Sequence, residues 1–448
     1  MSETKKQPVV IIVGAGFGGL MMGLLLERMG VPYTILERAA KVKPLGSAMS
    51  LKTNILTVLD QLGLLEEIVK FAAPVSGVDM LNAKLGKIGR IGWNERREVA
   101  GYEDYVFTRP KFYDLMLKQV PAHKVLMNKN VVRFEDTKEN VSVFCADGTT
   151  YQGDILIGVD GIHSGVRQNL YKQLEEQSLL PKSDAESLTI GYTCMLGVAE
   201  PKDPSKYPQL KDPFTHFATV LGGGLQSWIV ITVPGNQICW VLLKQFETAQ
   251  QSNEQALLNA EWGPESNEAM IKEYRDFACP LGGVLGDLID DTPNELISKV
   301  FLEEKLFETW HHGRTALIGD GAINAMQDAV IMSNCLYDMV DTTPESISTV
   351  FKEYYKQRYP RAKAMVEHSK DISKVLGGQT MVQRVARYAQ FNYTPYSVLQ
   401  RKFEKTAEYR PQFNWIPMIE ARGTGVVLPQ LPSRRYAEEQ AKRIVSKL

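Results

Sequence analysis

Residues 8–38, PVVIIVGAGFGGLMMGLLLERMGVPYTILER, decide the fold of this chain. An apolar run leads into a glycine-rich turn, an apolar segment follows, and a second apolar run closes the stretch. This order predicts a βαβ unit in which Gly30 ends the helix. Because two strands joined through a helix run parallel, the stretch predicts an α/β fold.

Three glycines occupy the turn between the predicted strand and the predicted helix. Gly14, Gly16 and Gly19 form the pattern G-x-G-x-x-G. Gly14 permits the tight turn, Gly16 lets the backbone approach a pyrophosphate, and Gly19 allows the helix to pack closely on the strand. The start of the helix then faces the anion.

An acidic residue follows at the end of the second predicted strand. Glu37 lies 23 residues after Gly14, where its carboxylate can accept hydrogen bonds from a ribose diol. The combined pattern predicts dinucleotide binding, and a purely structural glycine turn is the less favoured alternative. A ribose with a free 2′-hydroxyl suits NAD or the adenosine half of FAD. Arg38, next to Glu37, is also compatible with a ribose that carries a 2′-phosphate. The turn alone does not choose between these cofactors.

The composition excludes several classes of protein. The chain has 448 residues, a formal net charge of −1 and 44% hydrophobic residues, which is ordinary for a globular protein without a nucleic-acid partner. Its five cysteines form no C-x-x-C pair, which favours reduced, buried thiols in an intracellular, cytoplasmic chain. The six histidines show no metal-ligand spacing, so no metal site is predicted.

The rest of the chain divides into regions of different character. Residues 188–246 contain β-rich runs separated by glycine and proline, which predicts a separate antiparallel sheet. Residues 250–300 are polar with helical spacing, and residues 313–340 return to a buried strand followed by a buried helix. Residues 344–448 are mostly helical in pattern.

Two further stretches resemble motifs of a known family, and this resemblance favours FAD among the possible cofactors. DILIGVDGIHSGVR, residues 154–167, resembles the Asp-Gly motif of the class A flavoprotein monooxygenases, the para-hydroxybenzoate hydroxylase-like family. GRTALIGDGAINAMQDAV, residues 313–330, resembles the Gly-Asp motif of that family. The positions that match the first motif are Asp154, Gly158, Asp160, Gly161, Ser164, Val166 and Arg167.

The resemblance assigns roles to particular residues. Asp320 matches the aspartate that hydrogen-bonds the ribityl chain of FAD, and Arg109 matches an arginine that holds the ribityl and phosphate region. Residues 353–369 resemble the tyrosine- and arginine-rich helix that follows the flavin domain. The implied cofactor-binding residues are Gly14, Gly16, Gly19, Glu37, Arg38, Ser50, Arg109, Asp160, Asp320, Gly321, Ala322 and Asn324.

The resemblance covers residues 8–372 and is strongest to fungal FAD-dependent epoxidases and hydroxylases of secondary metabolism. It implies a Rossmann-like, glutathione-reductase-like FAD-binding domain, an antiparallel β-sheet substrate domain and a helical C-terminal region. The expected FAD-binding parts are residues 8–75, 101–185 and 301–375, the expected substrate-domain parts are residues 76–100 and 186–300, and the expected C-terminal region is residues 376–448.

The implied activity is that of a monooxygenase. NAD(P)H would serve as a transient reductant, and a flavin C4a-hydroperoxide formed with O₂ would hydroxylate or epoxidise a small apolar or aromatic substrate. This chemistry belongs to the cofactor, so no catalytic base is predicted. Two alternatives remain: an FAD-dependent dehydrogenase or desaturase, and an uncoupled or inactive flavoprotein homologue.

The second alternative arises from a shortened motif. In the family, a loop of the type A-x-H-x-x-x-P-x-x-G-Q follows the Gly-Asp pair, whereas Gly321 to Asn324 follow Asp320 directly here. About ten residues that normally pass beside the flavin ring are therefore absent from the pattern. Losing two or three hydrogen bonds predicts FAD binding weakened by roughly ten- to a hundredfold. A flavin ring that is open to water predicts release of peroxide and poor coupling of NAD(P)H oxidation to product formation.

Two regions outside the cofactor motifs attract attention. Tyr192, His216, Trp228 and Trp240 lie in the β-rich segment expected to form the roof over the substrate, although such residues are more often part of a core. Residues 384–410 interleave aromatic and basic side chains, which is compatible with peripheral contact to a membrane. A helical cap packed on the flavin domain is the favoured interpretation. The oligomeric state is not predicted.

Overall fold

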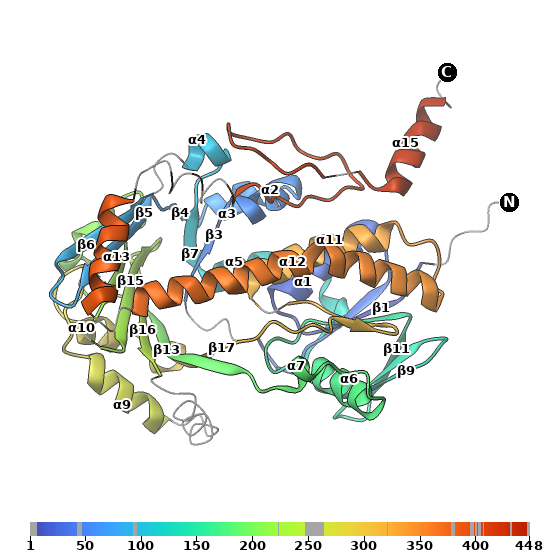
Figure 1. The fold of residues 1–448 in the computed structure, drawn as a ribbon, viewed down its shortest axis with the longest axis horizontal. Coiled ribbons are helices and arrows are strands. Elements are labelled where there is room, and N and C mark those ends of the chain that lie inside the picture. Colours follow the sequence, from blue (N-terminus) through green and yellow to red (C-terminus); the bar gives the residue numbers. More distant parts are fainter. Residues whose placement is uncertain are drawn as a thin grey trace.

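The computed structural model describes residues 7–42, 47–92, 96–222, 224–246, 264–319, 321–377, 381–394, 398, 401, 405, 407–430 and 432–445. One half of the molecule contains a six-stranded sheet in the order β18-β19-β12-β1-β2-β8, at the right of Figure 1. All neighbouring pairs in it are parallel except β18 with β19. The strands are β1 (Val10–Val13), β2 (Tyr33–Leu36), β8 (Val125–Leu126), β12 (Ile155–Gly158), β18 (His311–His312) and β19 (Thr315–Leu317).

Helices cover this parallel sheet because its strands are apolar on both faces. All four residues of β1 and all four of β12 are buried. Helix α1 (Phe17–Met29) packs against helix α11 (Ala322–Tyr337); the buried residues of α1 are apolar or glycine, whereas those of α11 are mostly apolar with a few polar side chains among them. The predicted α/β core with Gly30 ending the first helix is confirmed, since Gly30 is the C-cap of α1 with φ of 69°.

Two small sheets and several helices complete this half. β3 (Ala48–Leu51), β7 (Tyr105–Thr108) and β4 (Ala73–Pro74) form one three-stranded sheet, and β9 (Val131–Asp136), β10 (Val141–Cys145) and β11 (Thr150–Gly153) form the other. The helices are α2 (Thr53–Gln61), α3 (Leu65–Val69), α4 (Arg96–Ala100), α5 (Arg109–Leu117), α6 (Gly165–Glu176) and α7 (Lys182–Ala185).

The other half is built on a seven-stranded sheet, at the left of Figure 1. The strand order is β17-β13-β16-β15-β14-β5-β6. Its pairs are antiparallel as expected from the sequence, except that β14 and β5 run parallel. The strands are β5 (Gly77–Asn82), β6 (Lys87–Gly92), β13 (Thr189–Ala199), β14 (Phe217–Leu221), β15 (Gln226–Val233), β16 (Gln237–Gln245) and β17 (Ser298–Glu304).

Helices α9 (Pro264–Tyr274) and α10 (Leu285–Asp290) cover the outer face of this sheet. Trp228 and Trp240 belong to that outer core, where their ring N–H groups donate to Ala278 O at 3.1 Å and Thr292 Oγ1 at 2.9 Å. Both tryptophans are therefore core residues with satisfied N–H groups, which is the more common role weighed against a place in the roof over the substrate. Strand alternation places neighbouring side chains on opposite faces, but it does not reveal which face meets the other half.

The inner face of the sheet meets the first half through Val198, Ile231, Cys239 and Val241, which pack near Ala48 and Val106. The Ala48 amide donates to the Cys239 sulfur at 3.2 Å. Cys239 is fully buried, and the other four cysteines are also buried and unpaired, as predicted. Of the other two expected roof residues, Tyr192 follows the alternation of the inner-face residues of β13 and is half-buried. His216 pairs through its backbone with Thr232, and its ring lies 2.7 Å from Asp212.

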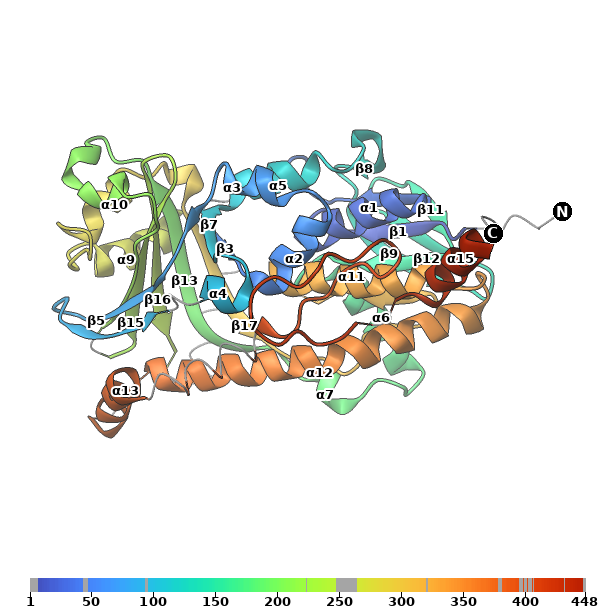
Figure 2. The same ribbon diagram turned by 90° about the horizontal axis from the view of Figure 1, so that it is seen from above.

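The C-terminal region crosses the whole molecule (Figures 1 and 2). Helix α12 (Pro344–Gly377) runs along both halves, helix α13 (Met381–Tyr393) lies beside β6, and helix α15 (Arg434–Val445) ends the described chain. The expected helical cap on the flavin half is wrong for α13. An irregular passage over residues 407–430 packs there instead, and Phe413 O accepts hydrogen bonds from the Gln61 side chain at 3.0 Å.

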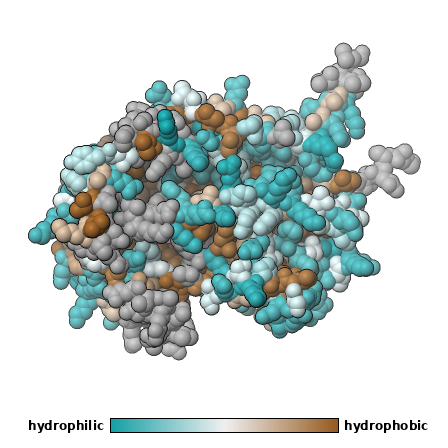
Figure 3. All heavy atoms as spheres, in the orientation of Figure 1, coloured by the Kyte–Doolittle hydropathy of each residue, from teal (hydrophilic) through white to brown (hydrophobic). Residues whose placement is uncertain are grey.

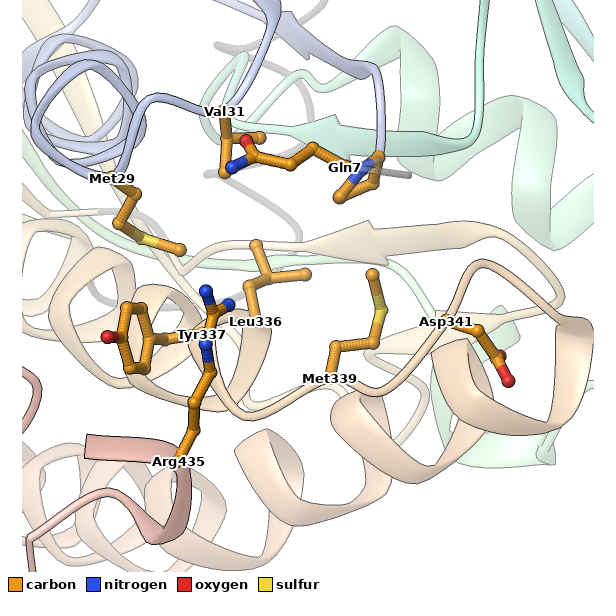
Figure 4. Close-up of a pocket in the computed structure, with 9 residues that line it drawn as sticks. Gln7, Met29, Val31, Leu336, Tyr337, Met339, Asp341 and Arg435 are labelled. Atoms are coloured by element: carbon orange, nitrogen blue, oxygen red, sulfur yellow. The ribbon is translucent and has the colours of Figure 1, made fainter. Parts of the chain in front are cut away.

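Within the described ranges, every helix is too short or too polar to traverse a lipid bilayer. A small cavity of about 60 Å³ lies where the C-terminal ends of α1 and α11 meet (Figure 4). Met29 and Leu336 line it together with Tyr337 and Arg435. Since α1 has 13 residues and rises about 1.5 Å per residue, this cavity lies roughly 20 Å from the start of α1. It is therefore separate from the glycine turn.

Candidate cofactor site

The glycine turn after β1 has the geometry that its sequence predicts. Gly14 has φ of +107°, and a Cβ there would lie 2.5 Å from Val159 O. A Cβ on Gly19 would lie 1.9 Å from Gly14 O, so the first turn of α1 needs glycine to approach the strand. Gly16 differs, because nothing lies within 4 Å of the position that its Cβ would take. The turn is therefore closed by packing at two glycines and open to a ligand at the third.

Glu37 is attached to this turn by backbone hydrogen bonds. Its Oε2 accepts the amide of Ala15 at 2.8 Å, and its Oε1 accepts the amide of Ala39 at 2.9 Å. Each carboxylate oxygen can accept more than one hydrogen bond, so both retain capacity for a diol. The carboxylate is half-buried beside the turn, which is the place predicted for a ribose contact.

Arg109 and Tyr113 reach the same turn from α5. The Arg109 guanidinium carbon lies 5.5 Å from the centre of the Phe17 ring at the start of α1, and Arg109 itself is exposed. The Tyr113 hydroxyl donates to Ala15 O at 3.0 Å. Burial, with a smaller contribution from Glu37, raises the pKa of Tyr113 to about 12, so the hydroxyl remains a donor at neutral pH. A cation and a positioning hydroxyl thus flank the turn.

Helices α1 and α11 begin side by side. A Cβ on Gly18 would lie 2.8 Å from the Cβ of Ala325, four residues into α11. Their C-terminal ends also share the small cavity, so the two helices run parallel. Both N-caps are glycines, Gly16 and Gly321, and no side chain caps either helix. Two positive dipole ends therefore face the same region, which favours an anion.

A buried ion pair fixes the connection between β19 and α11. Only residues 318–321 lie between the two elements. Asp328 of α11 accepts the Gly319 amide through Oδ2 at 2.9 Å and the Arg358 Nε through Oδ1 at 2.5 Å. The Tyr354 hydroxyl donates to Leu317 O at 3.1 Å. Asp320 itself lies outside the described residues, but the residues on either side of it are placed.

The Asp-Gly motif makes structural contacts near the glycine turn. The Asp160 carboxylate accepts the Ser164 hydroxyl at 2.5 Å and the Val166 amide at 3.2 Å, which organises the start of α6. The Cα of Asp160 would lie 3.0 Å from a Cβ on Gly14, so its backbone forms one wall of the turn. Asp154 accepts the Val9 amide at 2.8 Å. These contacts explain the motif as a support for the turn; direct contact of Asp160 with a cofactor stays a prediction.

The remaining predicted residues are placed as follows. Ala322 and Asn324 lie in the first turn of α11, next to the start of α1. Ser50 lies on β3 opposite Val106 of β7, the strand that leads directly into Arg109. Arg38 is exposed beside Glu37.

Buried polar atoms without partners test whether this site fits a cofactor. Among the described residues, Asn324 Oδ1, Asn54 Oδ1 and Thr53 Oγ1 are buried and accept no hydrogen bond. Asn54 belongs to the start of α2, and its carbonyl accepts the Gln327 side chain of α11 at 2.9 Å. Unpaired buried polar groups cost about 1–3 kcal/mol each, so Asn324 Oδ1, at the start of α11 beside the glycine turn, is an acceptor that a ligand here could satisfy. The residues present fit FAD.

Fold and site together define an FAD-binding flavoprotein. Residues 7–199 match the family described as "FAD binding domain". The FAD-dependent monooxygenase ptmM of Penicillium ochrochloron is 27% identical over 390 residues, which cover 81% of this chain and 87% of that protein. The FAD-dependent monooxygenase nvfK of Aspergillus novofumigatus is 25% identical over 386 residues, covering 81% and 78%.

Solved structures agree with this fold. HpxO of Klebsiella pneumoniae, complexed with FAD and uric acid, aligns with a TM-score of 0.67 at 20% identity, covering 90% of this chain and 96% of that chain. A salicylate hydroxylase substrate complex aligns with a TM-score of 0.63 at 18% identity, covering 89% and 98%. The chain therefore carries an FAD-binding domain and is similar to fungal FAD-dependent monooxygenases, as the sequence motifs predict.

Sequence reasoning missed several residues that build the site. Tyr113 lies four residues after Arg109 on one helix, so the two side chains share a face, and this spacing could have predicted that Tyr113 lies near the site. Asp328 and Arg358 lie within motifs that the sequence displays, but their contact joins residues 30 positions apart on two helices. No local pattern reveals that pairing.

Proposed function

We propose that this FAD-dependent monooxygenase uses NAD(P)H and O₂ to hydroxylate or epoxidise a small apolar or aromatic substrate. When bound, FAD supplies the electron transfer and the activation of O₂. The chain holds the cofactor through the starts of α1 and α11, with Glu37 at the ribose and Arg109 at the phosphate and ribityl region. Asn324 supplies a buried acceptor to the same ligand.

The inner face of the seven-stranded sheet carries the proposal about the substrate. Alternation places further side chains on the same face as Val198, Ile231 and Cys239. Five of these are apolar but not buried, since four are partly buried and Leu302 is 40% exposed, although the inner face is turned toward the cofactor half. They are Leu196, Ile229, Leu243, Val300 and Leu302. An incompletely covered apolar face in this place suits an apolar substrate.

Polar groups on this face are few and uncharged. On β13, β15 and β16 the inward positions include Tyr192, Ser227 and Gln245, and these described strands present no Asp, Glu or His there. Such a surface can orient a substrate by hydrogen bonding, and it lacks an acid-base pair for hydrolysis. It supports oxygen transfer in which the protein positions the substrate and excludes water.

The short connection between β19 and α11 favours a second outcome. Residues 318–321 leave no room for the longer loop of the family. If the flavin ring is less shielded, NAD(P)H oxidation will release peroxide in place of oxygenated product. A dehydrogenase or desaturase on the same fold is a further alternative.

One set of measurements distinguishes these functions. The purified chain is loaded with FAD and supplied with NADH or NADPH and a panel of apolar and aromatic substrates under ¹⁸O₂, and NAD(P)H consumption, peroxide and ¹⁸O in the product are measured together. The proposal predicts ¹⁸O in the product. A product that is oxidised without ¹⁸O would identify a dehydrogenase. Peroxide equal to the NAD(P)H consumed, with every substrate, would identify an uncoupled flavoprotein.

A further inference from the structure

Helix α13 presents its apolar side to solvent and a basic residue to the protein. Met381, Val382 and Val385 are 81%, 79% and 61% exposed, whereas Arg387 is only 9% exposed. An amphipathic helix in a globular protein normally turns its apolar stripe toward the core. The reversed orientation of α13 indicates that a surface outside the described chain covers this stripe.

The exposed stripe extends beyond these three residues. Tyr388 and Tyr393 are 49% and 74% exposed, and Ile91 of the neighbouring strand β6 is 37% exposed. Figure 3 shows hydrophobic side chains reaching the surface at the end of the molecule where Figure 1 places α13. Tyrosine beside aliphatic side chains is suited to an interface that is apolar on one side and wet on the other.

The charge of α13 and of the sequence that follows it identifies the kind of surface. Residues 381–405 contain five basic residues and one acidic residue, a net charge of 5 − 1 = +4 in a chain whose formal net charge is −1. Arg401 and Lys405 are exposed. The basic residues are Arg384, Arg387, Arg401, Lys402 and Lys405, and the acidic residue is Glu404. Basic charge in the same stretch of sequence as an exposed apolar stripe complements an anionic lipid surface.

A second copy of this chain fits the stripe less well. A two-fold symmetric dimer brings the same patch of both copies together. Here it would place one segment of charge +4 against another of the same charge. Like charges within a Debye length of about 8 Å repel each other at physiological ionic strength.

We propose that α13 docks this protein on the surface of an anionic lipid bilayer, with Met381, Val382 and Val385 in the interfacial layer. Helices of this kind lie in the plane of the interface, so the proposal is consistent with the absence of a described helix able to traverse a bilayer. Since α13 lies beside β6, the edge strand of the seven-stranded sheet, docking brings the substrate half against the lipid (Figure 2).

Vesicle flotation with the full FAD-loaded chain tests this proposal. The probes are vesicles of phosphatidylcholine alone and of phosphatidylcholine with 30% phosphatidylserine. We expect binding to the second and much weaker binding to the first. The double variant Val382→Glu/Val385→Glu should reduce the partition coefficient by at least about tenfold. The double variant Arg401→Glu/Lys405→Glu should reduce it by roughly 25-fold or more, because each basic residue near an anionic surface contributes about fivefold.

Val340→Glu is the matched control, because Val340 is 60% exposed and lies outside α13. It should bind the vesicles as the parent chain does. All variants replace exposed side chains, so thermal unfolding and FAD content should be unchanged. The proposal is overturned if the parent chain floats with neither vesicle, or if Val382→Glu/Val385→Glu binds as well as the control. It is also overturned if sedimentation velocity shows a dimer that this double variant dissolves, since the stripe is then a protein interface.

Discussion

Arg358 Nε lies 2.5 Å from Asp328 Oδ1, and the two side chains are only 1% and 2% exposed. The second oxygen of Asp328 holds the Gly319 amide at 2.9 Å. One buried carboxylate thus joins α12 and α11 to the turn that carries Asp320. We expect the pair to act on the cofactor site through the position of this turn.

Removing one partner of this pair should affect both stability and FAD affinity. We expect Arg358→Met to lower the free energy of unfolding by about 3–5 kcal/mol, because the Asp328 charge remains buried without compensation. Exposed pairs contribute at most about 1 kcal/mol, so Arg275→Ala, which breaks the exposed pair with Asp290, is the control. Denaturant unfolding measures both.

A second variant separates stability from positioning. Asp328→Leu/Arg358→Met removes both charges and should recover most of the lost stability. It still deprives the Gly319 amide of its acceptor, so FAD affinity should stay low. An affinity equal to that of the parent chain would show that the pair is structural only.

Glu37→Gln should weaken FAD binding while leaving the fold intact. A hydrogen bond to a charged group contributes about 1.5–3 kcal/mol, so replacing the carboxylate should raise the FAD dissociation constant by roughly 10- to 150-fold. Glu27→Gln is the control, because Glu27 pairs with Lys124 at the other end of α1. Quenching of FAD fluorescence gives both constants. Equal FAD dissociation constants for the two variants would show that Glu37 does not contribute to FAD binding.

His311 should make the stability of the protein depend on pH. Burial lowers the pKa of His311 to about 4, and the neighbouring charges of Lys352 and His312 act in the same direction. Between the unfolded pKa of about 6.5 and the folded pKa of about 4, the unfolded chain binds more protons, so stability falls as the pH falls through this range.

His311→Phe should flatten this pH dependence, since phenylalanine keeps the ring contacts with Phe351 and Tyr355 without the titration. Urea midpoints from pH 7.5 to pH 4 check it, and His163→Asn at a largely exposed histidine is the control. An unchanged slope in His311→Phe would refute the assignment.

Lengthening the connection after Asp320 should improve coupling. A variant with a loop of the family pattern, about ten residues long, is expected to bind FAD more tightly and to release less peroxide per NAD(P)H. A glycine-serine insert of equal length controls for chain length. If the parent chain already releases negligible peroxide with its substrate, the shortened turn does not impair coupling.

The sequence revealed those parts of the site that are formed by residues close together along the chain. Gly14, Gly16 and Gly19 are dictated by one strand-turn-helix, and Glu37 follows from the next strand. Contacts between distant segments were not readable, since the Asp328 and Arg358 pair depends on how two helices pack. The helical periodicity of α13 likewise predicts a stripe but not the direction it faces.

The most direct test of the account is an FAD titration of the apoprotein and its Gly16→Val variant, with Gly92→Ala as a control at a second glycine whose Cβ position is open. Fluorescence quenching should give one FAD per chain, with a dissociation constant between about 10 nM and about 1 µM. Gly92→Ala should match the parent chain, and Gly16→Val should bind at least about a hundredfold more weakly, because its side chain fills the space left for the pyrophosphate. Equal FAD affinity in all three proteins would contradict the account.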